Sequence, residues 1–333
     1  MNLKVGLLGG GSWGTTVASL TARNCPTKIW ARDMATVNEI NELHRNEKYL
    51  PGALLTPSLR ACASIEETVT DADVIVMGIP AQHFRQVLKD ARPFIRPWVP
   101  IISLAKGLEE GTMLRMTEVI EEEMEGHPAG VLTGPNLAKE IIFGQAAASV
   151  IAMVDDTIAN RLQRVFKTGL FRVYTNEDVI GCELGGALKN IVAIAAGMGD
   201  GSGAGENTRA AIITRGLAEL TRLGVAMGGQ PATFAGLAGM GDLVATCSSE
   251  KSRNRTVGYQ LGLGRKIDDI IADMAEVAEG VKTAKVVMDL AKKYNLNMPI
   301  TESVYKVLYE GSTARQVFKG LLKMDIGSEA GPG

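Results

Sequence analysis

The start of this chain holds a glycine-rich turn between an apolar run and a helical stretch. The apolar run Leu3–Leu8 leads into G-x-G-x-x-G at residues 9–14, a helical pattern opens at Ser12, and a second apolar run follows at Thr27–Trp30. A strand, a glycine turn, a helix and a second strand in this order are typical of a dinucleotide-binding unit. We therefore predict a sheet that begins with Leu3–Leu8, with a nucleotide at the end of that strand.

Each glycine of the motif has its own physical role. Gly9 permits the tight turn, Gly11 lets the backbone approach a pyrophosphate held by N–H groups of the helix start, and Gly14 lets helix and strand pack closely. Because the chain has 38 glycines, the motif alone is weak, and a turn without a ligand is the alternative. The flanking strand and helix favour the dinucleotide.

Length and charge limit the classes of function. A chain of 333 residues exceeds the usual size of one core, which predicts about two domains. The composition, 46% hydrophobic and 22% charged, is that of an ordinary globular protein. The net charge of −2 gives no electrostatic reason to expect nucleic acid or an anionic membrane as partner, although a few local cations can still hold a small anionic substrate.

Cysteines and histidines indicate the compartment and the metal content. The four cysteines form no C-x-x-C pair, which favours reduced thiols and a cytoplasmic protein. The three histidines form no metal motif, so no metal is expected. A signal peptide is an alternative for the N-terminal run, but the glycine turn accounts for it better. No other uninterrupted apolar run approaches a membrane span, so membrane insertion is not expected.

Short β-like runs alternate with helical stretches in the first half of the chain. Their apolar character on both faces favours a parallel sheet covered by helices, with ligands beyond the carboxyl ends of the strands. Distinctive sequences follow several of these ends, at residues 79–80, 103–107 and 133–136. The predicted strands are Leu3–Leu8, Lys28–Ala31, Val74–Ile79, Pro100–Ser103, Gly130–Leu132, Ser149–Met153 and Phe171–Tyr174.

Helical periodicity replaces the β-like runs from about Asp178 onward. We therefore predict a Rossmann-like, doubly wound α/β parallel sheet over 1–180, an all-α domain over 181–326 that holds substrate, and a flexible tail at 327–333. The helices predicted for the second half are Leu184–Ala196, Thr208–Gly224, Ser252–Leu263, Thr283–Lys293 and Ile300–Glu310.

The end of the second predicted strand indicates which dinucleotide binds. Sites for NAD usually place Asp or Glu about 20 residues after the first glycine, where it binds the ribose 2′-hydroxyl. Here Arg32 stands near that position, with Asp33 one residue later. A guanidinium suits a 2′-phosphate, which favours NADP with NAD also accepted. The alternative is that Arg32 is only a solvated charge.

Lys189 lies among small and apolar residues of a predicted helix, E-L-G-G-A-L-K-N-I. A lysine so placed is partly desolvated, which favours reversible proton transfer near neutral pH. The alternative is a surface lysine whose stem lies along apolar residues. The neighbouring glycines favour the first interpretation, because they would let a substrate come close.

Ser252, Arg253 and Asn254 open a helix behind a glycine loop and predict an anion site. A guanidinium can bind phosphate in a fork, while hydroxyl, amide and helix N–H groups add donors. A plain helix cap is the alternative for Ser252, and a plain surface charge is the alternative for Arg255.

Seven blocks in this order resemble the NAD(P)-dependent glycerol-3-phosphate dehydrogenases, the bacterial branch best, over nearly the whole chain. They are GGGSWGTTVA, NEKYLPG, LAKGLE, LTGPNLAKEI, ELGGALKNIVAIAAG, GLAGMGDLVATCSSEKSRNR and AEGVKTA. The resemblance implies the reversible reduction of dihydroxyacetone phosphate to sn-glycerol 3-phosphate, which supplies phospholipid synthesis.

The resemblance also implies site residues. Lys189 would exchange a proton with the C2 oxygen, and Lys106 would contact substrate near the nicotinamide. The remaining substrate residues would be Gly134, Asn136, Asn190, Asp242, Thr246, Ser252, Arg253 and Asn254. The cofactor residues would be Gly9, Gly11, Ser12, Trp13, Gly14, Arg32, Lys106, Ala138, Arg253, Val277 and Glu279.

Two positions depart from the family pattern. Asn136 stands where a serine is expected, and Leu137 stands where an aromatic residue is common. Asn136 can still form hydrogen bonds.

Two other functions stay open at this point. A 3-hydroxyacid or 6-phosphogluconate type of dehydrogenase pairs a similar nucleotide domain with a helical domain and a catalytic lysine. A non-catalytic NADP sensor would keep only the nucleotide domain. Apolar helical faces in the second half could support a homodimer.

Overall fold

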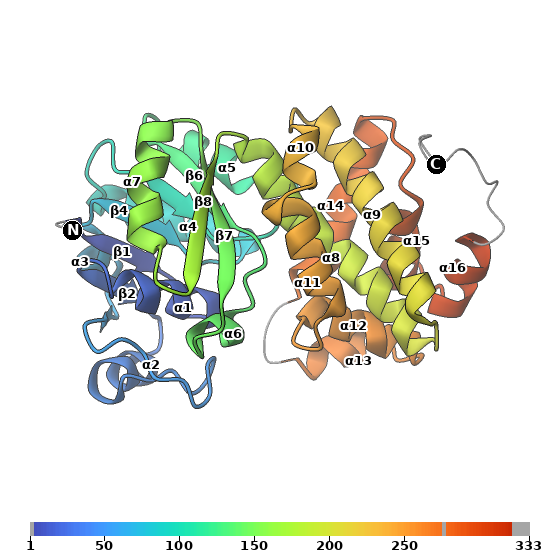
Figure 1. Ribbon diagram of the computed structural model, residues 1–333, viewed down its shortest axis with the longest axis horizontal. Helices are drawn as coiled ribbons and strands as arrows, with labels where there is room; N and C mark the ends of the chain where they lie inside the picture. The colour runs from blue at the N-terminus through green and yellow to red at the C-terminus, as the bar shows by residue number, and fades with distance from the viewer. Residues whose placement is uncertain (1–2, 275–277, 322–333) are drawn as a thin grey trace. The chain divides into compact units, whose positions relative to one another are not determined.

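A computed structural model describes residues 3–274 and 278–321 of the chain (Figure 1). The chain divides into two compact units. The sheet unit comprises residues 1–106 and 114–183, and the helical unit comprises residues 107–113 and 184–333. The tail predicted to be flexible, 327–333, lies outside the described residues, and so does Val277.

The sheet unit is built on one sheet of eight strands in the order β3-β2-β1-β4-β5-β6-β7-β8. The first six follow the doubly wound order of dinucleotide-binding folds, in which the direction of winding reverses between β1 and β4. The predicted Rossmann-like fold with a helical second part is therefore confirmed. The strands are β1 Val5–Leu8, β2 Thr27–Trp30, β3 Arg60–Cys62, β4 Val74–Met77, β5 Ile101–Ser103, β6 Ala129–Thr133, β7 Ala147–Met153 and β8 Phe171–Asn176.

Two features of the sheet differ from the expected one. Strand β3 was not predicted, because it has three residues, of which only Ala61 is buried. Strand β7 pairs antiparallel to β6, whereas every other pairing is parallel. The only helix between β6 and β7 has five residues, about 7.5 Å at 1.5 Å per residue, which is too short to return the chain to the start of a parallel strand.

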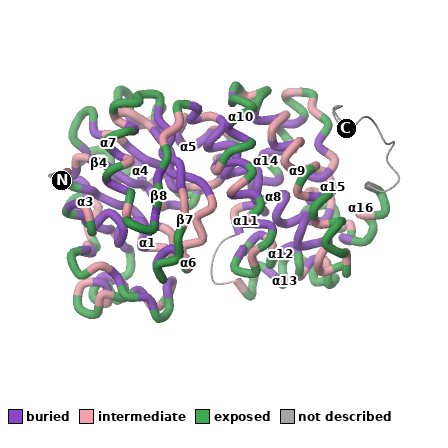
Figure 2. Tube along the Cα trace, viewed as in Figure 1, coloured by how far each residue is buried: buried purple, intermediate pink, exposed green. Residues whose placement is uncertain are grey.

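Helices cover both faces of the sheet, as the all-buried strands require. Leu7 on β1 packs in one cluster with side chains of α1 and α7, while Leu8 packs in the other with side chains of α4 and α5. Figure 2 shows the central strands buried and the outer helix faces exposed. The helices of this unit are α1 Ser12–Thr21, α2 Met34–Asn38, η1 Glu39–Leu43, α3 Ile65–Val69, α4 Ala81–Ala91, η2 Arg92–Phe94, α5 Met116–Glu123, α6 Ala138–Ile142 and α7 Asp156–Phe166.

The described part of the helical unit contains all five predicted helices and several short ones that were not predicted. Helix α8 begins in the sheet unit and continues from Leu184 into the helical unit. The helices are α8 Val179–Gly201, α9 Glu206–Ala226, α10 Pro231–Phe234, η3 Leu237–Gly241, α11 Asp242–Ser248, α12 Arg253–Gly262, α13 Ile267–Ala272, α14 Glu279–Lys293, α15 Pro299–Tyr309 and α16 Ala314–Leu321.

By length and composition alone, α8 could cross a membrane, the one described helix that could. However, 94% of its most apolar window is buried inside the structure, and the core helix of a globular protein passes the same test.

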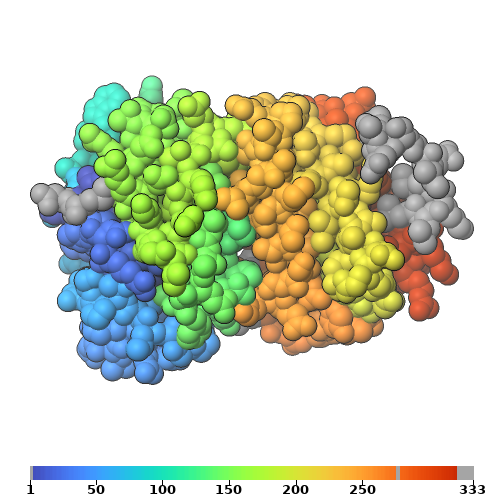
Figure 3. Space-filling model, viewed as in Figure 1, coloured from blue at the N-terminus to red at the C-terminus, as the bar shows by residue number. Residues whose placement is uncertain are grey.

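Surface atoms of α9 (yellow) and of α11–α12 (orange) are visible in Figure 3.

Candidate functional site

The glycine turn of the sheet unit has the backbone expected of a pyrophosphate site. Gly9 has φ +121°, and a Cβ there would collide with the carbonyl oxygen of Gly78. A Cβ on Gly14 would collide with the carbonyl oxygen of Gly9, so only a glycine at this position lets helix and turn pack this closely. A Cβ on Gly11 would meet nothing within 4 Å, so the backbone there is open to a ligand.

The N-terminus of α1 faces this opening without a side-chain cap. Gly11 is its N-cap residue, and no acidic residue lies in its first turn. The positive end of the helix dipole is therefore not neutralised by the helix's own side chains, which suits an anion.

Arg32 and Asp33 have different environments after β2. Asp33 caps α2, because its Oδ1 accepts a hydrogen bond from the N–H of Ala35 at 3.0 Å. Arg32 is exposed, and the described residues form no ion pair with it. Asp33 is therefore already engaged in capping, whereas the Arg32 side chain is exposed to solvent.

Trp13 and Ala138 pack against the same core cluster, from α1 and from α6. The Trp13 ring meets the Phe171 ring edge-on, with 6.3 Å between the ring centroids. Trp13 Nε1 is buried and has no hydrogen-bond partner among the described residues. The two elements predicted to contact the cofactor therefore lie side by side.

Lys106, Gly134 and Asn136 are brought together where β5 and β6 end. Lys106 Nζ donates to the carbonyl oxygen of Gly134 at 2.8 Å, and Gly134 has φ +128°. Asn136 Nδ2 donates to Oγ of Ser149 at 3.1 Å, and that hydroxyl donates to the carbonyl oxygen of Thr133 at 2.7 Å. Asn136, which replaces the expected serine, is thus anchored to β7.

Lys189 is the centre of a buried polar cluster in the helical unit. Its Nζ donates to Oγ1 of Thr246 at 2.6 Å and to Oδ1 of Asn190 at 3.1 Å, and it lies 3.1 Å from Oδ1 of Asp242. Thr246 in turn donates its hydroxyl proton to Asp242 Oδ1 at 3.2 Å. Lys189 is only 4% exposed, so the alternative of a surface lysine is wrong.

The cluster accounts for every proton of the Lys189 ammonium. An ammonium has three N–H donors, and the hydroxyl, the amide oxygen and the carboxylate supply three acceptors. Such a group can bind an oxygen of a substrate by exchanging one of these acceptors for it, with its charge still balanced by Asp242.

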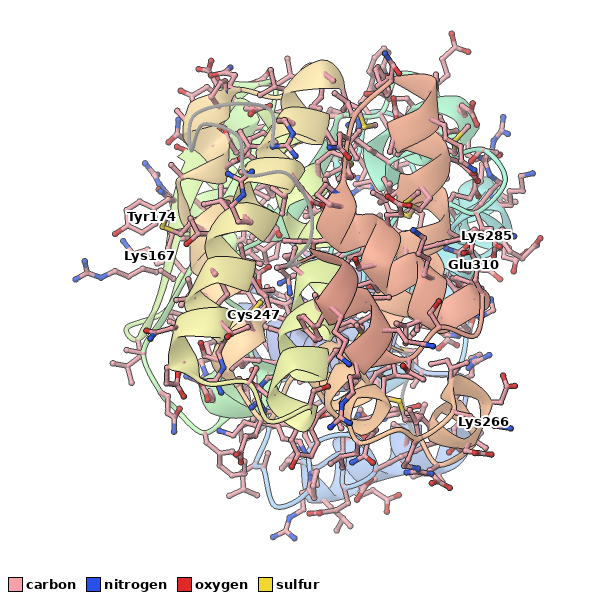
Figure 4. All side chains as sticks on the ribbon, turned by 90° about the vertical axis from the view of Figure 1, so that its right-hand side faces the viewer. Lys167, Tyr174, Cys247, Lys266, Lys285 and Glu310 are labelled. Atoms are coloured by element: carbon pink, nitrogen blue, oxygen red, sulfur yellow. The ribbon has the colours of Figure 1, made fainter. Side chains whose placement is uncertain are left out.

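Cys247 lies next to this cluster but cannot act as a nucleophile near neutral pH. Burial raises the pKa of the Cys247 thiol to about 12, although the Lys189 charge opposes the shift. The nucleophile would be the thiolate, which this pKa excludes near pH 7. Figure 4 shows Cys247 among the helices, and all four cysteines are free.

A close helix contact places Asp242 and Thr246 beside Lys189. A Cβ on Gly185 of α8 would lie 2.5 Å from the carbonyl oxygen of Ala238, so only glycine lets η3 and the start of α11 approach α8. This corrects the interpretation that the glycines near Lys189 leave room for substrate, because the backbone of Ala238 fills the room at Gly185.

The start of α12 meets the start of α14 beside Asn190. Asn254 Oδ1 accepts a hydrogen bond from the N–H of Gly280 at 3.0 Å. A Cβ on Gly280 would lie 2.9 Å from the carbonyl oxygen of Asn190. Two helix N-termini therefore lie close to the lysine cluster, and that of α14 carries Glu279 in its first turn.

The side chains at the start of α12 have distinct roles. Ser252 Oγ accepts from the N–H of Arg255 at 3.3 Å, so the cap alternative is confirmed for this residue. Arg253 is exposed on the first turn, and Glu279 begins α14. Arg255 is not a plain surface charge, because its Nη2 lies 2.7 Å from Asp200 Oδ2.

Asp200 was not predicted as part of the site region, yet it fixes α12. Its two oxygens bind two arginines, Arg255 of α12 and Arg209 of α9, with Nη2 of Arg209 at 2.8 Å. The sequence offered no local sign of this, because Asp200 and Arg255 are 55 residues apart. The other residue missed was Asn46, which contacts the glycine turn.

The predicted site residues that the structure describes thus form three groups, two in the sheet unit and one in the helical unit. The sheet unit brings together the glycine turn, Trp13 and Ala138, and separately Lys106, Gly134 and Asn136. The helical unit brings together Lys189, Asn190, Asp242 and Thr246 with the starts of α12 and α14. No group of three His, Cys, Asp or Glu side chains able to hold a metal occurs in the described part of the chain.

Family models and known proteins were compared with the chain. The model of the NAD-dependent glycerol-3-phosphate dehydrogenase N-terminus matches residues 4–159, and that of the C-terminus matches residues 178–319. A glycerol-3-phosphate dehydrogenase [NAD(P)+] of Sphingopyxis alaskensis is 62% identical over 333 residues and all of both chains. One of Mycobacterium avium is 54% identical over 98% of this chain and 96% of its own.

Solved structures agree with these matches. The glycerol-3-phosphate dehydrogenase of Coxiella burnetii superposes with a TM-score of 0.92 at 35% identity, over 97% of this chain and 99% of that one. A ketopantoate reductase family protein of Ralstonia eutropha has a TM-score of 0.62 at 14% identity, over 96% of this chain and all of that one. The second likeness shows a shared fold alone.

Proposed function

Because this chain belongs to the NAD-dependent glycerol-3-phosphate dehydrogenase family, we propose that it reversibly reduces dihydroxyacetone phosphate to sn-glycerol 3-phosphate. The cofactor is NAD(P), and NADPH is the form that we propose it prefers. The observation that carries the reaction is the buried cluster of Lys189, Asn190, Asp242 and Thr246. The cluster holds the Nζ of Lys189 within hydrogen-bond distance of three acceptors, one of which a substrate oxygen could replace.

Lys189 is the proton donor in the direction of reduction. A nicotinamide cofactor held at the glycine turn of Gly9, Gly11 and Gly14 would supply the hydride for carbonyl carbon C2 of the substrate. As negative charge develops on the C2 oxygen, the Lys189 ammonium donates a hydrogen bond to it and then its proton, which leaves a neutral amine. Asp242 and Thr246 keep Nζ in position through the transfer. In the oxidising direction the neutral amine takes the proton back.

The phosphate of the substrate serves for orientation. Arg253, on the first turn of α12, offers a guanidinium near the positive end of that helix. The phosphate does not react, so its binding energy places C2 for the hydride. We assign Gly134, Asn136 and Lys106 to the same substrate, supported by their common place beyond β5 and β6.

Most of the residues that we assign to the cofactor belong to the sheet unit. Gly9, Gly11 and Gly14 shape the turn for the pyrophosphate, and Arg32 is proposed to bind the 2′-phosphate of NADPH. Ser12, Trp13, Ala138 and Glu279 are assigned on the family resemblance. The 3-hydroxyacid type of dehydrogenase is not favoured, because the matches name glycerol-3-phosphate dehydrogenase.

We also propose a setting for the enzyme. Its product would feed glycerophospholipid synthesis, and the four free cysteines support a reducing compartment such as the cytoplasm. The homodimer stays a prediction, which sedimentation at several concentrations would test.

The direct test is oxidation of NADPH, followed at 340 nm, with a panel of substrates. We expect turnover with dihydroxyacetone phosphate and none with 2-oxo or 3-oxo acids that lack a phosphate. NADH should replace NADPH at lower efficiency. Oxidation of NADPH with an oxo acid but not with dihydroxyacetone phosphate would refute the assignment, and binding without any turnover would favour the NADP sensor.

A further inference from the structure

One buried side chain ties the segment after η1 to the glycine turn. Asn46 has no exposed surface, and its Nδ2 donates to the carbonyl oxygen of Gly10 at 3.0 Å and to Oγ1 of Thr15 at 2.9 Å. Thr15 lies on α1, directly after Gly14 and one turn after Gly11. Asn46 belongs to the NEKYLPG block, to which the proposed reaction gives no role.

We propose that Asn46 is a positioning residue that holds the Gly10–Gly11 peptide in the orientation that binds the cofactor pyrophosphate. The proposal rests on the proposed function, since it assumes a dinucleotide at the turn. It concerns the affinity for the dinucleotide rather than the chemistry at the carbonyl carbon.

The geometry of the peptide bond carries the argument. In a trans peptide the C=O and the N–H point in opposite directions, and the described residues contain no cis peptide. Because Asn46 binds the Gly10 oxygen, the N–H of Gly11 points away from Asn46. A Cβ on Gly11 would meet nothing within 4 Å, so the backbone beside this N–H borders the open space next to α1.

The orientation of the Asn46 amide is fixed by its partners. A backbone carbonyl only accepts hydrogen bonds, so the nitrogen of the amide must face Gly10. Asn46 Oδ1 is buried without a partner among the described residues, which costs free energy. An apolar side chain would avoid that cost, so the two donated bonds are what an asparagine contributes here.

The backbone around Asn46 is ordered by its own contacts. The carbonyl oxygen of Asn46 accepts from the N–H of Leu50 at 2.7 Å, and Leu50 is completely buried. A second tie lies further along α1, where Thr56 Oγ1 donates to the carbonyl oxygen of Ser19 at 2.8 Å. Side-chain hydrogen bonds therefore join the segment to α1 at Thr15 and at Ser19, and only those of Asn46 also reach the glycine turn.

The two ties allow a matched comparison. Asn46→Leu keeps the branching and the number of side-chain heavy atoms and removes both donors at the turn. Thr56→Val keeps the branched shape and removes the hydroxyl of the other tie. The dissociation constant of NADPH is measured by quenching of protein fluorescence without any substrate, and the melting temperature is measured in parallel.

We expect Asn46→Leu to weaken NADPH binding about tenfold, the equivalent of one hydrogen bond, while Thr56→Val changes it less than about twofold. At saturating NADPH, kcat with dihydroxyacetone phosphate should stay near that of the wild type. An unchanged dissociation constant in Asn46→Leu, or an equal loss in Thr56→Val, would overturn the proposal.

A second variant keeps the test usable if Asn46→Leu does not fold. Thr15→Val removes one acceptor of Asn46 and should weaken NADPH binding roughly threefold, about half the free energy of a hydrogen bond. No change in this variant would count against the proposal. Failure of the wild type to bind NADPH would instead refute the proposed function, so the two failures can be told apart.

Discussion

At the scale of the residue, Lys189 combines burial with complete hydrogen bonding. A lysine that is 4% exposed is stable only with a partner for its charge, and Asp242 supplies it at 3.1 Å. Asn190 Oδ1 and Thr246 Oγ1 accept hydrogen bonds from the other two N–H groups of the ammonium. The pair of charges therefore serves both the fold and the proposed proton transfer, and a test must separate the two roles.

Lys189→Ala should lower kcat for dihydroxyacetone phosphate by ~10²–10⁴, the usual effect of losing a general acid. It should leave the dissociation constant of NADPH nearly unchanged. The control is Lys285→Ala, because Lys285, labelled in Figure 4, is a half-exposed lysine of the same unit. Its Nζ pairs with Glu110 at 3.1 Å. Turnover of Lys189→Ala at the level of the control would remove Lys189 from the mechanism.

A double variant separates the chemistry from stability. Lys189→Ala alone leaves Asp242 buried without a cation, at a cost of about 3–5 kcal/mol. Lys189→Met with Asp242→Asn removes both charges and should recover much of the melting temperature, measured by circular dichroism. Its turnover should stay low. Recovery of activity together with stability would mean that Lys189 is only structural.

Arg32 determines the choice between the cofactors if it binds the 2′-phosphate. Arg32→Ala should raise KM for NADPH while leaving KM for NADH nearly unchanged, because only NADPH carries that phosphate. Arg45→Ala is the control, since Arg45 is a partly exposed arginine paired with Glu47. An unchanged ratio of kcat/KM for the two cofactors would show that Arg32 does not read the phosphate.

At the scale of the element, the crossing of α8 and α12 positions the proposed phosphate site. Cβ atoms on Gly197 and Gly201 would collide with the backbone of α12, and Cβ atoms on Gly258 and Gly262 would approach the backbone of α8. Two pairs of glycines, each spaced by four, therefore let the helices touch backbone to backbone. The ion pair between Asp200 of α8 and Arg255 of α12 also joins the two helices, near the start of α12.

Gly258→Ala should destabilise the protein by about 1–3 kcal/mol, because the added methyl group overlaps the carbonyl oxygen of Ile194. It should also raise KM for dihydroxyacetone phosphate, since the start of α12 must move. Gly320→Ala in α16 is the control, because a Cβ there would meet nothing within 4 Å. The melting temperature of Gly258→Ala should be lower than that of Gly320→Ala. Equal melting temperatures would contradict the close contact between α8 and α12.

Patterns local in sequence predicted most elements and the residue types of the site. Apolar runs and the glycine turn indicated seven strands, and periodicity indicated five long helices. Pairings distant in sequence were beyond such reasoning, as the contact of Asn46 with Gly10 and that of Asp200 with Arg255 show. The antiparallel direction of β7 follows from the shortness of α6, and no clear pattern in the sequence indicates how long that helix is.

At the scale of the whole molecule, the residues assigned to the reaction come from both units. The sheet unit supplies the glycine turn, Arg32 and Lys106, and the helical unit supplies Lys189, Asp242 and Arg253. The glycine turn alone is compatible with many reactions, since one nucleotide fold serves many chemistries. The family matches identify the reaction as reduction of a carbonyl group, and the proton transfer that we propose for the buried Lys189 fits that reaction.

The most direct test of this account follows the hydride itself. Dihydroxyacetone phosphate is incubated with the enzyme and NADPH that carries deuterium at both C4 positions of the nicotinamide, and the product is analysed by NMR and mass spectrometry. We expect sn-glycerol 3-phosphate with one deuterium at C2. Product without deuterium at C2, or no conversion by an enzyme that binds NADPH, would contradict it.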